Sequence, residues 1–140
     1  MTLSDCQIEA LMYFYPMLDS EYQTPDLSLR VTIDEDNQTI KLSFYGKSKA
    51  QSPSDFLNPI LQEICSRAIK GNKNIILDFY HLEFMNSATV SPIIKLWAQL
   101  KTLGISLTVE FNSELMWQKA NFMAFSIFEK ESKLFNLRAR

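Results

Sequence analysis

The chain has 140 residues, of which 46% are hydrophobic and 21% are charged, and its formal net charge is −2. This length and composition are typical of one globular domain built around a single core. A mildly acidic chain without a basic block is a poor match for nucleic acid or for an anionic membrane surface, so we expect neither as a partner.

Composition also argues against most catalytic chemistry. The chain contains three glycines and no phosphate-cradling GxGxxG or GxxxxGK[ST] loop, so no nucleotide cofactor is indicated. Cys6 and Cys65 lack metal-ligand spacing, and His81 is the only histidine, which disfavours zinc. No G-x-S-x-G elbow accompanies His81, which we interpret as a surface residue. We therefore expect no catalytic residues, no metal and no cofactor.

The N-terminal sequence predicts a helix over 4–14, because Ile8, Leu11, Met12 and Tyr15 follow a Ser/Asp cap at helical spacing. It carries an early acid and no basic region, which is unlike a signal peptide, and no apolar run is long enough to span a membrane. With Cys65 expected as a reduced core thiol, the chain is predicted to be cytoplasmic. We assign residues 1–26 to a helical extension and 27–140 to the domain. Whether the extension packs on the sheet or makes a homodimer stays open.

Two alternating stretches, "LSLRVTI" (27–33) and "TIKLSFYG" (39–46), flank the turn "DEDNQ" and predict a β-hairpin. After the polar loop "KSKAQSPSD", apolar residues between 56 and 68 recur at helical spacing and predict a helix that ends at Gly71. Its start is open: either Ser52 or Ser54 begins it and Pro59 lies inside, or Asn58 caps it and Pro59 takes the first position.

The second half alternates strands and helices. "NIILDFY" (74–80) is nearly continuously apolar, which is typical of a strand buried on both faces. A helix from Val90 to Gly104 follows, with Ser87 or Ser91 as candidate caps, and "ISLTVEF" (105–111) is the next strand. A third helix, capped by Ser113, extends to Met123, and a short strand or helix is expected around 125–128. Trp97 and Trp117 are interpreted as core residues, with an exposed patch of Trp117, Phe122 and Phe125 as the alternative.

This order of elements predicts an α/β fold in one domain. The leading hairpin and the strand–helix–strand units give a mixed sheet of four to five strands, with the helices mainly on one face.

Residues from about 32 to 128 resemble STAS domains, the sulfate-transporter and anti-sigma-factor-antagonist module. The match follows "IILDFYHLEFMNSATVSPIIKLWAQLKTLGISLTVEF". The segment Phe84-Met85-Asn86-Ser87 falls on the family's turn of aromatic, apolar, acidic and hydroxyl residues, and Gly104 falls on its helix-ending glycine. The loop "YGKSKAQSPSDF" falls on part of the family's partner surface.

The resemblance implies a phosphorylation switch. In stand-alone STAS proteins a partner kinase phosphorylates the hydroxyl of this turn and a phosphatase restores binding. That hydroxyl maps to Ser87, with Thr89 as the second candidate. The implied partner-binding residues are Asn86, Ser87, Ala88 and Thr89 in the turn and Ser48 and Ser52 in the preceding loop. Asn86 replaces the family's acid, and "MNSAT" resembles the SiaC-type bacterial phosphoproteins, which act on a diguanylate cyclase pathway.

Ser87 just before a helix would suit a phosphate, because a helix N-terminus offers unpaired N–H groups and partial positive charge. Local capping alone would also explain a serine there. The first hypothesis is therefore a non-enzymatic regulatory phosphoprotein, served by a serine kinase and phosphatase or an anti-sigma-like switch protein. The second is a constitutive interaction scaffold without a covalent switch. The third, a small-ligand binder or enzyme, is disfavoured because no polar cluster converges in the sequence.

Overall fold

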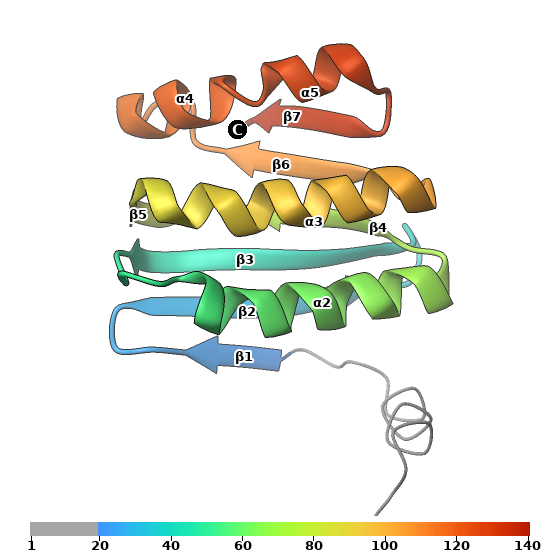
Figure 1. Ribbon diagram of the computed structural model, residues 1–140, viewed down its shortest axis with the longest axis horizontal. Coiled ribbons are helices and arrows are strands. Elements are labelled where there is room, and N and C mark those ends of the chain that lie inside the picture. The colour runs from blue at the N-terminus through green and yellow to red at the C-terminus, as the bar shows by residue number, and fades with distance from the viewer. Residues whose placement is uncertain (1–19) are drawn as a thin grey trace, which may run out of the picture.

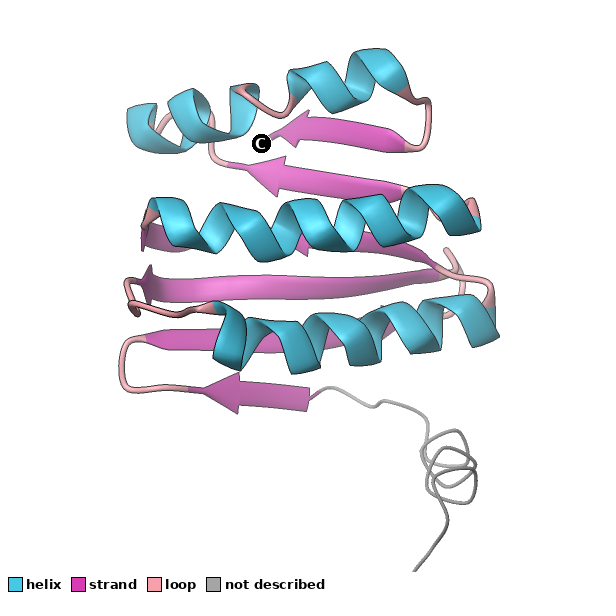
Figure 2. Cartoon of the chain, viewed as in Figure 1, coloured by secondary structure: helices cyan, strands magenta, loops and turns pink. Residues whose placement is uncertain are grey.

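The computed structural model describes residues 20–140, so the helix expected over 4–14 lies outside the described residues. Seven strands form one mixed sheet, and the helices of residues 20–140 cover one face of it (Figures 1 and 2). The strands are β1 (Ser20–Gln23), β2 (Leu27–Asp34), β3 (Thr39–Ser48), β4 (Asn74–Asp78), β5 (Leu82–Met85), β6 (Leu107–Phe111) and β7 (Phe135–Ala139). The helical elements are α2 (Ser54–Gly71), the 3-10 turn η1 (Ser87–Thr89), α3 (Val90–Leu103), α4 (Met116–Met123) and α5 (Ser126–Glu131).

The α/β class, the mixed sheet and the one-sided helix layer are as predicted, but the sheet is wider than expected. Its order is β1-β2-β3-β4-β6-β7, with β5 paired to the end of β3. β1, β2 and β3 are antiparallel, whereas β4, β6 and β7 continue the sheet in parallel. β1, β5 and β7 lie outside the strands that the sequence predicts. β1 falls within the residues assigned to the N-terminal extension, which therefore contribute an edge strand.

The core fills the space between the sheet and the helices, because both layers turn an apolar side inward. Alternate residues of the hairpin are buried as predicted, and they are Leu27, Leu29 and Val31 on β2 and Ile40, Leu42 and Phe44 on β3. The facing stripe of α2 is Leu57, Ile60, Leu61, Ile64, Cys65 and Ala68. Trp97 of α3 is buried edge-on against Phe135, and Trp117 is half-buried against the core, so both are packing residues as interpreted from the sequence.

β4 differs from its predicted environment. The sequence indicated a strand buried on both faces, but the structure places helices on one face and leaves Ile76 on the other half-exposed. The next residue on the open face, Asp78, is 4% exposed because the long basic side chains of Lys41 on β3 and Arg140 just after β7 contact it. The near-continuous apolar run therefore reflects partial shielding by side chains rather than a second helix layer.

The helix ends follow backbone chemistry that the sequence predicts in part. α2 begins at Ser54 with Pro59 inside it, which is the first of the two predicted alternatives. Its left-handed C-cap is Asn72 rather than Gly71, whereas Gly104 ends α3 with φ +71° as expected. Ser113 does not cap α4; its hydroxyl donates to the carbonyl oxygen of Arg140 instead.

Both edges of the sheet are tied to helices. The Tyr22 hydroxyl of β1 donates to the Glu63 carboxylate of α2 at 3.1 Å, and burial, followed by the Glu63 charge, raises the pKa of the phenol above its usual value. On β7 the outward N–H of Leu137 donates to the Glu129 carboxylate of α5 at 2.9 Å, which occupies a donor that an edge strand would otherwise present to another chain. None of the helices within 20–140 has the length and apolarity needed to cross a bilayer.

Candidate functional site

The candidate turn begins where β5 ends beside β3. Ser48 pairs with Met85 in this parallel ladder, and the Asn86 N–H donates to the Ser48 carbonyl oxygen at 2.9 Å. The chain then enters η1, which runs without a break into α3. The predicted turn therefore lies at the carboxyl edge of the parallel strands, where α2 and α3 also begin (Figure 1).

Asn86 caps this helical segment, so neither Ser87 nor Ser91 takes the role that the sequence suggested. Its backbone is extended, and its Oδ1 accepts from the N–H of Thr89 at 3.2 Å and from the Thr89 hydroxyl at 2.8 Å. Its Nδ2 donates to the Ala50 carbonyl oxygen at 2.8 Å. An aspartate could accept the first two bonds but has no donor for the third, so the asparagine makes a contact that an acid at this position could not make.

Thr89 and Ser48 form a buried pair beneath the turn. Their hydroxyl oxygens lie 2.7 Å apart, and the two residues are 0% and 2% exposed. Because the single Thr89 hydroxyl proton goes to Asn86, the Ser48 hydroxyl must donate to Thr89. In this conformation a kinase cannot reach Thr89, which argues against it as a phosphoacceptor. Ser48 likewise supports the turn from below rather than offering its side chain to a partner.

Ser87, Ala88 and Ser52 lie on the surface. Ser87 is the first residue of η1, and among residues 20–140 its hydroxyl has no hydrogen-bond partner. The first N–H groups of a helical segment lack intrahelical acceptors, so an anion on Ser87 would meet unpaired donors and the positive end of the helix dipole. Of the six predicted partner-binding residues, the structure thus exposes three and uses Asn86, Thr89 and Ser48 to hold the turn in shape.

Two exposed apolar side chains lie near Ser87 in the chain. Phe84, three residues earlier on β5, is 46% exposed. Ile94 of α3 is 40% exposed and follows Ser87 by seven residues, about two helical turns. Neither residue is among the partner-binding residues that the sequence predicts. The elements on each side of the candidate turn therefore each expose one large apolar side chain.

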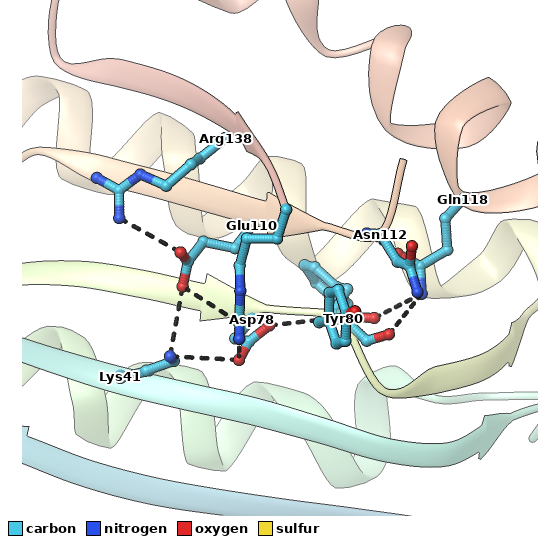
Figure 3. A network of polar contacts seen from close by, with 9 residues as sticks. Lys41, Asp78, Tyr80, Glu110, Asn112, Gln118 and Arg138 are labelled. Atoms are coloured by element: carbon cyan, nitrogen blue, oxygen red, sulfur yellow. Dashed lines mark hydrogen bonds and ion pairs between the residues drawn. The ribbon is translucent and has the colours of Figure 1, made fainter. Parts of the chain in front are cut away.

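A second polar cluster lies on the open face of the sheet (Figure 3). Asp78 of β4 and Glu110 of β6 are cross-strand neighbours, and the Lys41 amine lies 3.4 Å from a carboxylate oxygen of each. Arg138 contacts Glu110 at 3.3 Å, and Arg140 contacts Asp78 at 3.0 Å. Three cations therefore neutralise two carboxylates that would otherwise repel each other. Every charge has an opposite partner, which is typical of a structural network.

His81 borders this network and is exposed, as predicted. Its ring stacks on Tyr45 with centroids 5.3 Å apart and meets the edge of Tyr80 at 5.0 Å. The Arg140 guanidinium lies 4.6 Å above the Tyr80 ring. Within residues 20–140 no group of three or more His, Cys, Asp or Glu side chains is arranged to hold a metal ion.

Gln118 connects the open-face network to the helix layer (Figure 3). This α4 side chain is fully buried, and its Nε2 donates to the carbonyl oxygens of Phe79 at 2.6 Å and Leu82 at 2.9 Å. Its Oε1 accepts from the Asn112 N–H at 2.7 Å. No sequence pattern indicates this role, because a lone glutamine in a helix resembles any surface glutamine. It fixes the start of α4 against the β4–β5 turn.

The comparisons with known proteins identify structures of similar fold. No protein-family model matches the sequence, and no curated protein matches it. The chain is similar to SiaC of Pseudomonas aeruginosa, with 16% identity over 89% of this chain and 100% of that one and a TM-score of 0.58. It is also similar to a chain in the crystal structure of the diguanylate cyclase SiaD in complex with its activator SiaC from the same organism, with 13% identity, coverage of 87% and 100%, and a TM-score of 0.60. At these identities the likeness establishes that the chain has the fold seen in those structures.

Proposed function

We propose that this protein is a non-enzymatic regulator that binds a partner protein at the carboxyl edge of its sheet and is switched by phosphorylation of Ser87. The observation that carries the proposal is the exposed Ser87 at the start of a capped helical segment, with the exposed apolar residues Phe84 and Ile94 on the elements before and after it. The fold adds support, because SiaC in the similar complex is described as the activator of a diguanylate cyclase.

The unmodified surface suits a protein partner. Phe84 and Ile94 offer apolar area that a docked partner would remove from water, at roughly 25 cal/mol per Å². Ser87 between them is small and uncharged, so it can be covered at little cost. Following the likeness to the SiaD–SiaC complex, we propose a diguanylate cyclase as the effector. A serine kinase and phosphatase as the modifying partners follow from the proposed modification of Ser87 alone.

A phosphate would change the docking surface and leave the fold intact. It adds about −1.5 to −2 charges at neutral pH, and the start of the helical segment would stabilise them while Ser87 stays in water. A partner pressed over Phe84 and Ile94 would have to desolvate this dianion, which costs several kcal/mol when no cation pairs with it. About 4 kcal/mol corresponds to a thousandfold loss of affinity.

The turn itself does not use the Ser87 side chain. Its hydrogen bonds run through Asn86, Thr89 and Ser48, all of which stay in place when Ser87 is modified. Phosphorylation is therefore expected to act on binding rather than on stability.

The test uses full-length protein with phosphoserine incorporated at position 87 during translation, so that no kinase need be identified first. Affinity for a diguanylate cyclase from the source organism is measured by calorimetry for this form and for unmodified protein. Phosphoserine at Ser66 is the control, because Ser66 is exposed on α2 and about 18 Å along that helix from its start. We expect phosphoserine 87 to weaken binding at least tenfold and phosphoserine 66 to leave it within about twofold.

A second measurement asks whether the cell uses the site. Protein isolated from its own cells is analysed by mass spectrometry next to Ser87→Ala, and the phosphorylated peptide should contain Ser87 and disappear in the variant. Equal cyclase binding by the modified and unmodified forms would instead support a constitutive scaffold. Absence of cyclase binding by either form would refute the proposed effector.

A further inference from the structure

We propose that the outer side of α4 and α5 is a docking surface for residues 1–19 of a second copy of this chain. The inference does not depend on Ser87. It starts from exposed apolar residues on these two helices and the turn between them: Met116, Ala120 and Met123 on α4, Ala124 in the turn and Ile127 on α5. We call these residues the outer stripe.

The outer stripe leaves three large apolar side chains exposed to water. Met116 is 84% exposed, Met123 47% and Ile127 53%. The inner side of the same helices is already occupied, since Phe122 and Phe125 are buried in the core. The two helices are therefore apolar on both sides, whereas a surface helix with no further contact normally carries polar residues on its outer side. Flexible methionine side chains suit a surface that accepts another helix.

Residues 1–19 have the matching chemistry. Their sequence carries Ile8, Leu11, Met12 and Tyr15 at the spacing of one helix face. Such a face requires an apolar contact to be stable, because a short isolated helix is marginal in water. The outer stripe supplies an apolar surface of the kind that a helix-in-groove contact uses.

Charge leaves room for this pairing without driving it. The first 19 residues contain Asp5, Glu9 and Asp19 and no lysine or arginine. The exposed charges of α4, α5 and their flanks are balanced, with Lys119, Lys130 and Lys133 against Glu114, Glu129 and Glu131. An acidic segment laid along the stripe would pair with the lysines at the rim of the contact, where such pairs favour the register more than they add affinity.

The length of chain between Tyr15 and β1 decides whether residues 1–19 of the same copy or of a second copy can contact the outer stripe. Residues 1–19 join the sheet at β1, and α4 and α5 lie beside β7 at the opposite edge (Figure 1). Five strand spacings separate β1 from β7, or about 24 Å. The five residue steps from Tyr15 to Ser20 span at most about 17 Å when fully extended. The apolar face up to Tyr15 cannot lie along the stripe of its own chain, so the occupant is the segment of another copy, in a reciprocal two-fold exchange.

The first test locates the contact in the full-length protein. A photo-cross-linking amino acid replaces Met123, and the protein is prepared in natural-isotope and 15N-labelled forms that are mixed before irradiation. We expect cross-links from position 123 to residues 1–19 in which the two peptides carry different labels. Cross-links confined to one copy, or mapped to any other part of the chain, would overturn the proposal.

The second test measures association of the full-length chain by sedimentation equilibrium. Ile127→Glu should raise the dimer Kd at least tenfold, because it places a carboxylate in the stripe against an acidic segment. Leu103→Glu is the matched control, since Leu103 is 50% exposed on α3 and off the stripe, and it should change Kd less than twofold. On the segment, Leu11→Glu should act like Ile127→Glu and Gln7→Glu should not. Equal effects of Ile127→Glu and Leu103→Glu, or a wild-type chain that stays monomeric at about 1 mM, would refute the inference.

Discussion

Replacement of Thr89 by valine removes one hydroxyl from a buried chain of hydrogen bonds and keeps the shape of the side chain nearly unchanged. The chain runs from the Ser48 hydroxyl to Thr89 at 2.7 Å and from Thr89 to the Asn86 amide oxygen at 2.8 Å. In Thr89→Val the Asn86 oxygen keeps the Thr89 backbone donor, but the Ser48 hydroxyl loses its acceptor inside the protein. An orphaned buried polar group costs about 1–3 kcal/mol, so we expect a loss of about 2 kcal/mol.

A second variant, Ser48→Ala, separates the cost of leaving a buried hydroxyl without an acceptor from the cost of the lost hydrogen bond itself. Ser48→Ala removes the donor and leaves Thr89 bonded to Asn86, so it should cost about 1 kcal/mol. In the double variant no orphaned hydroxyl remains at Ser48. Its cost should therefore fall below the sum of the two single costs by about 1 kcal/mol, which is the coupling expected for side chains in direct contact.

Urea unfolding monitored by tryptophan fluorescence measures all three variants. Thr102→Val serves as the control, because the Thr102 hydroxyl is exposed and donates only to the Gln99 carbonyl oxygen of its own helix, so its loss should cost less than about 0.5 kcal/mol. If Thr89→Val were no more costly than Thr102→Val, or if the double variant were strictly additive, the buried chain would not hold the turn and the structural role given to Thr89 would be wrong.

Three further outcomes follow from local geometry. Gly46→Ala should lower the free energy of unfolding by about 3 kcal/mol, because Gly46 has φ +90° and a Cβ there would collide with the Asp26 carbonyl oxygen. Gly104→Ala should lower it by only about 1 kcal/mol, because Gly104 has φ +71° but lies in open space. Equal losses for the two variants would contradict this account. Asn86→Asp should lower the free energy of unfolding, measured in urea, by about 1 kcal/mol, because the carboxylate cannot donate to the Ala50 carbonyl oxygen and the helix dipole offsets only part of that loss. A gain in stability would show that the hydrogen bond from Asn86 to Ala50 is unimportant. Burial raises the pKa of the Cys65 thiol, so less of it is thiolate at a given pH. Alkylation of Cys65 at pH 8, followed by mass spectrometry, should be at least about tenfold slower in the folded protein than in urea-unfolded protein. Equal rates would place the thiol at the surface.

The parts of the fold that sequence reasoning predicted are those with strong periodicity. The alternation in 27–33 and 39–46 marks the hairpin, and the stripes of α2 and α3 mark the core-facing sides of those helices. The strands that it missed are short. β5 has four residues in the run before the turn, and β1 has four residues of mixed polarity, so neither is long enough to show a period. β7 follows α5 after a three-residue turn, and although its residues alternate between apolar and polar, five residues directly after a helix are too few to establish a strand period.

The site was predictable in its position but not in its internal bonding. The order of strand, small polar turn and helix indicated where Ser87 would be exposed, because a helix that follows a buried strand must begin at the surface. The cap could not be assigned in the same way, since Asn86, Ser87 and Ser91 all have side chains that can cap a helix. Asn86 takes this role because the ladder of β3 and β5 holds its backbone beside Ser48 and brings the Ala50 carbonyl oxygen within reach of its amide.

Different residues of this turn hold its structure and offer a modifiable hydroxyl, which makes a surface switch physically reasonable. A modification that also broke the cap would release the Ser48–Thr89 contact, and the stability lost would compete with any effect on binding. Here the neighbouring positions differ: the side chains of Asn86 and Thr89 make the hydrogen bonds of the turn, and Ser87 is exposed and takes no part in them. A phosphate at Ser87 would then change the affinity for the proposed partner without weakening the turn. A form of the protein with phosphoserine at 87 should accordingly unfold at nearly the same urea concentration as the unmodified chain.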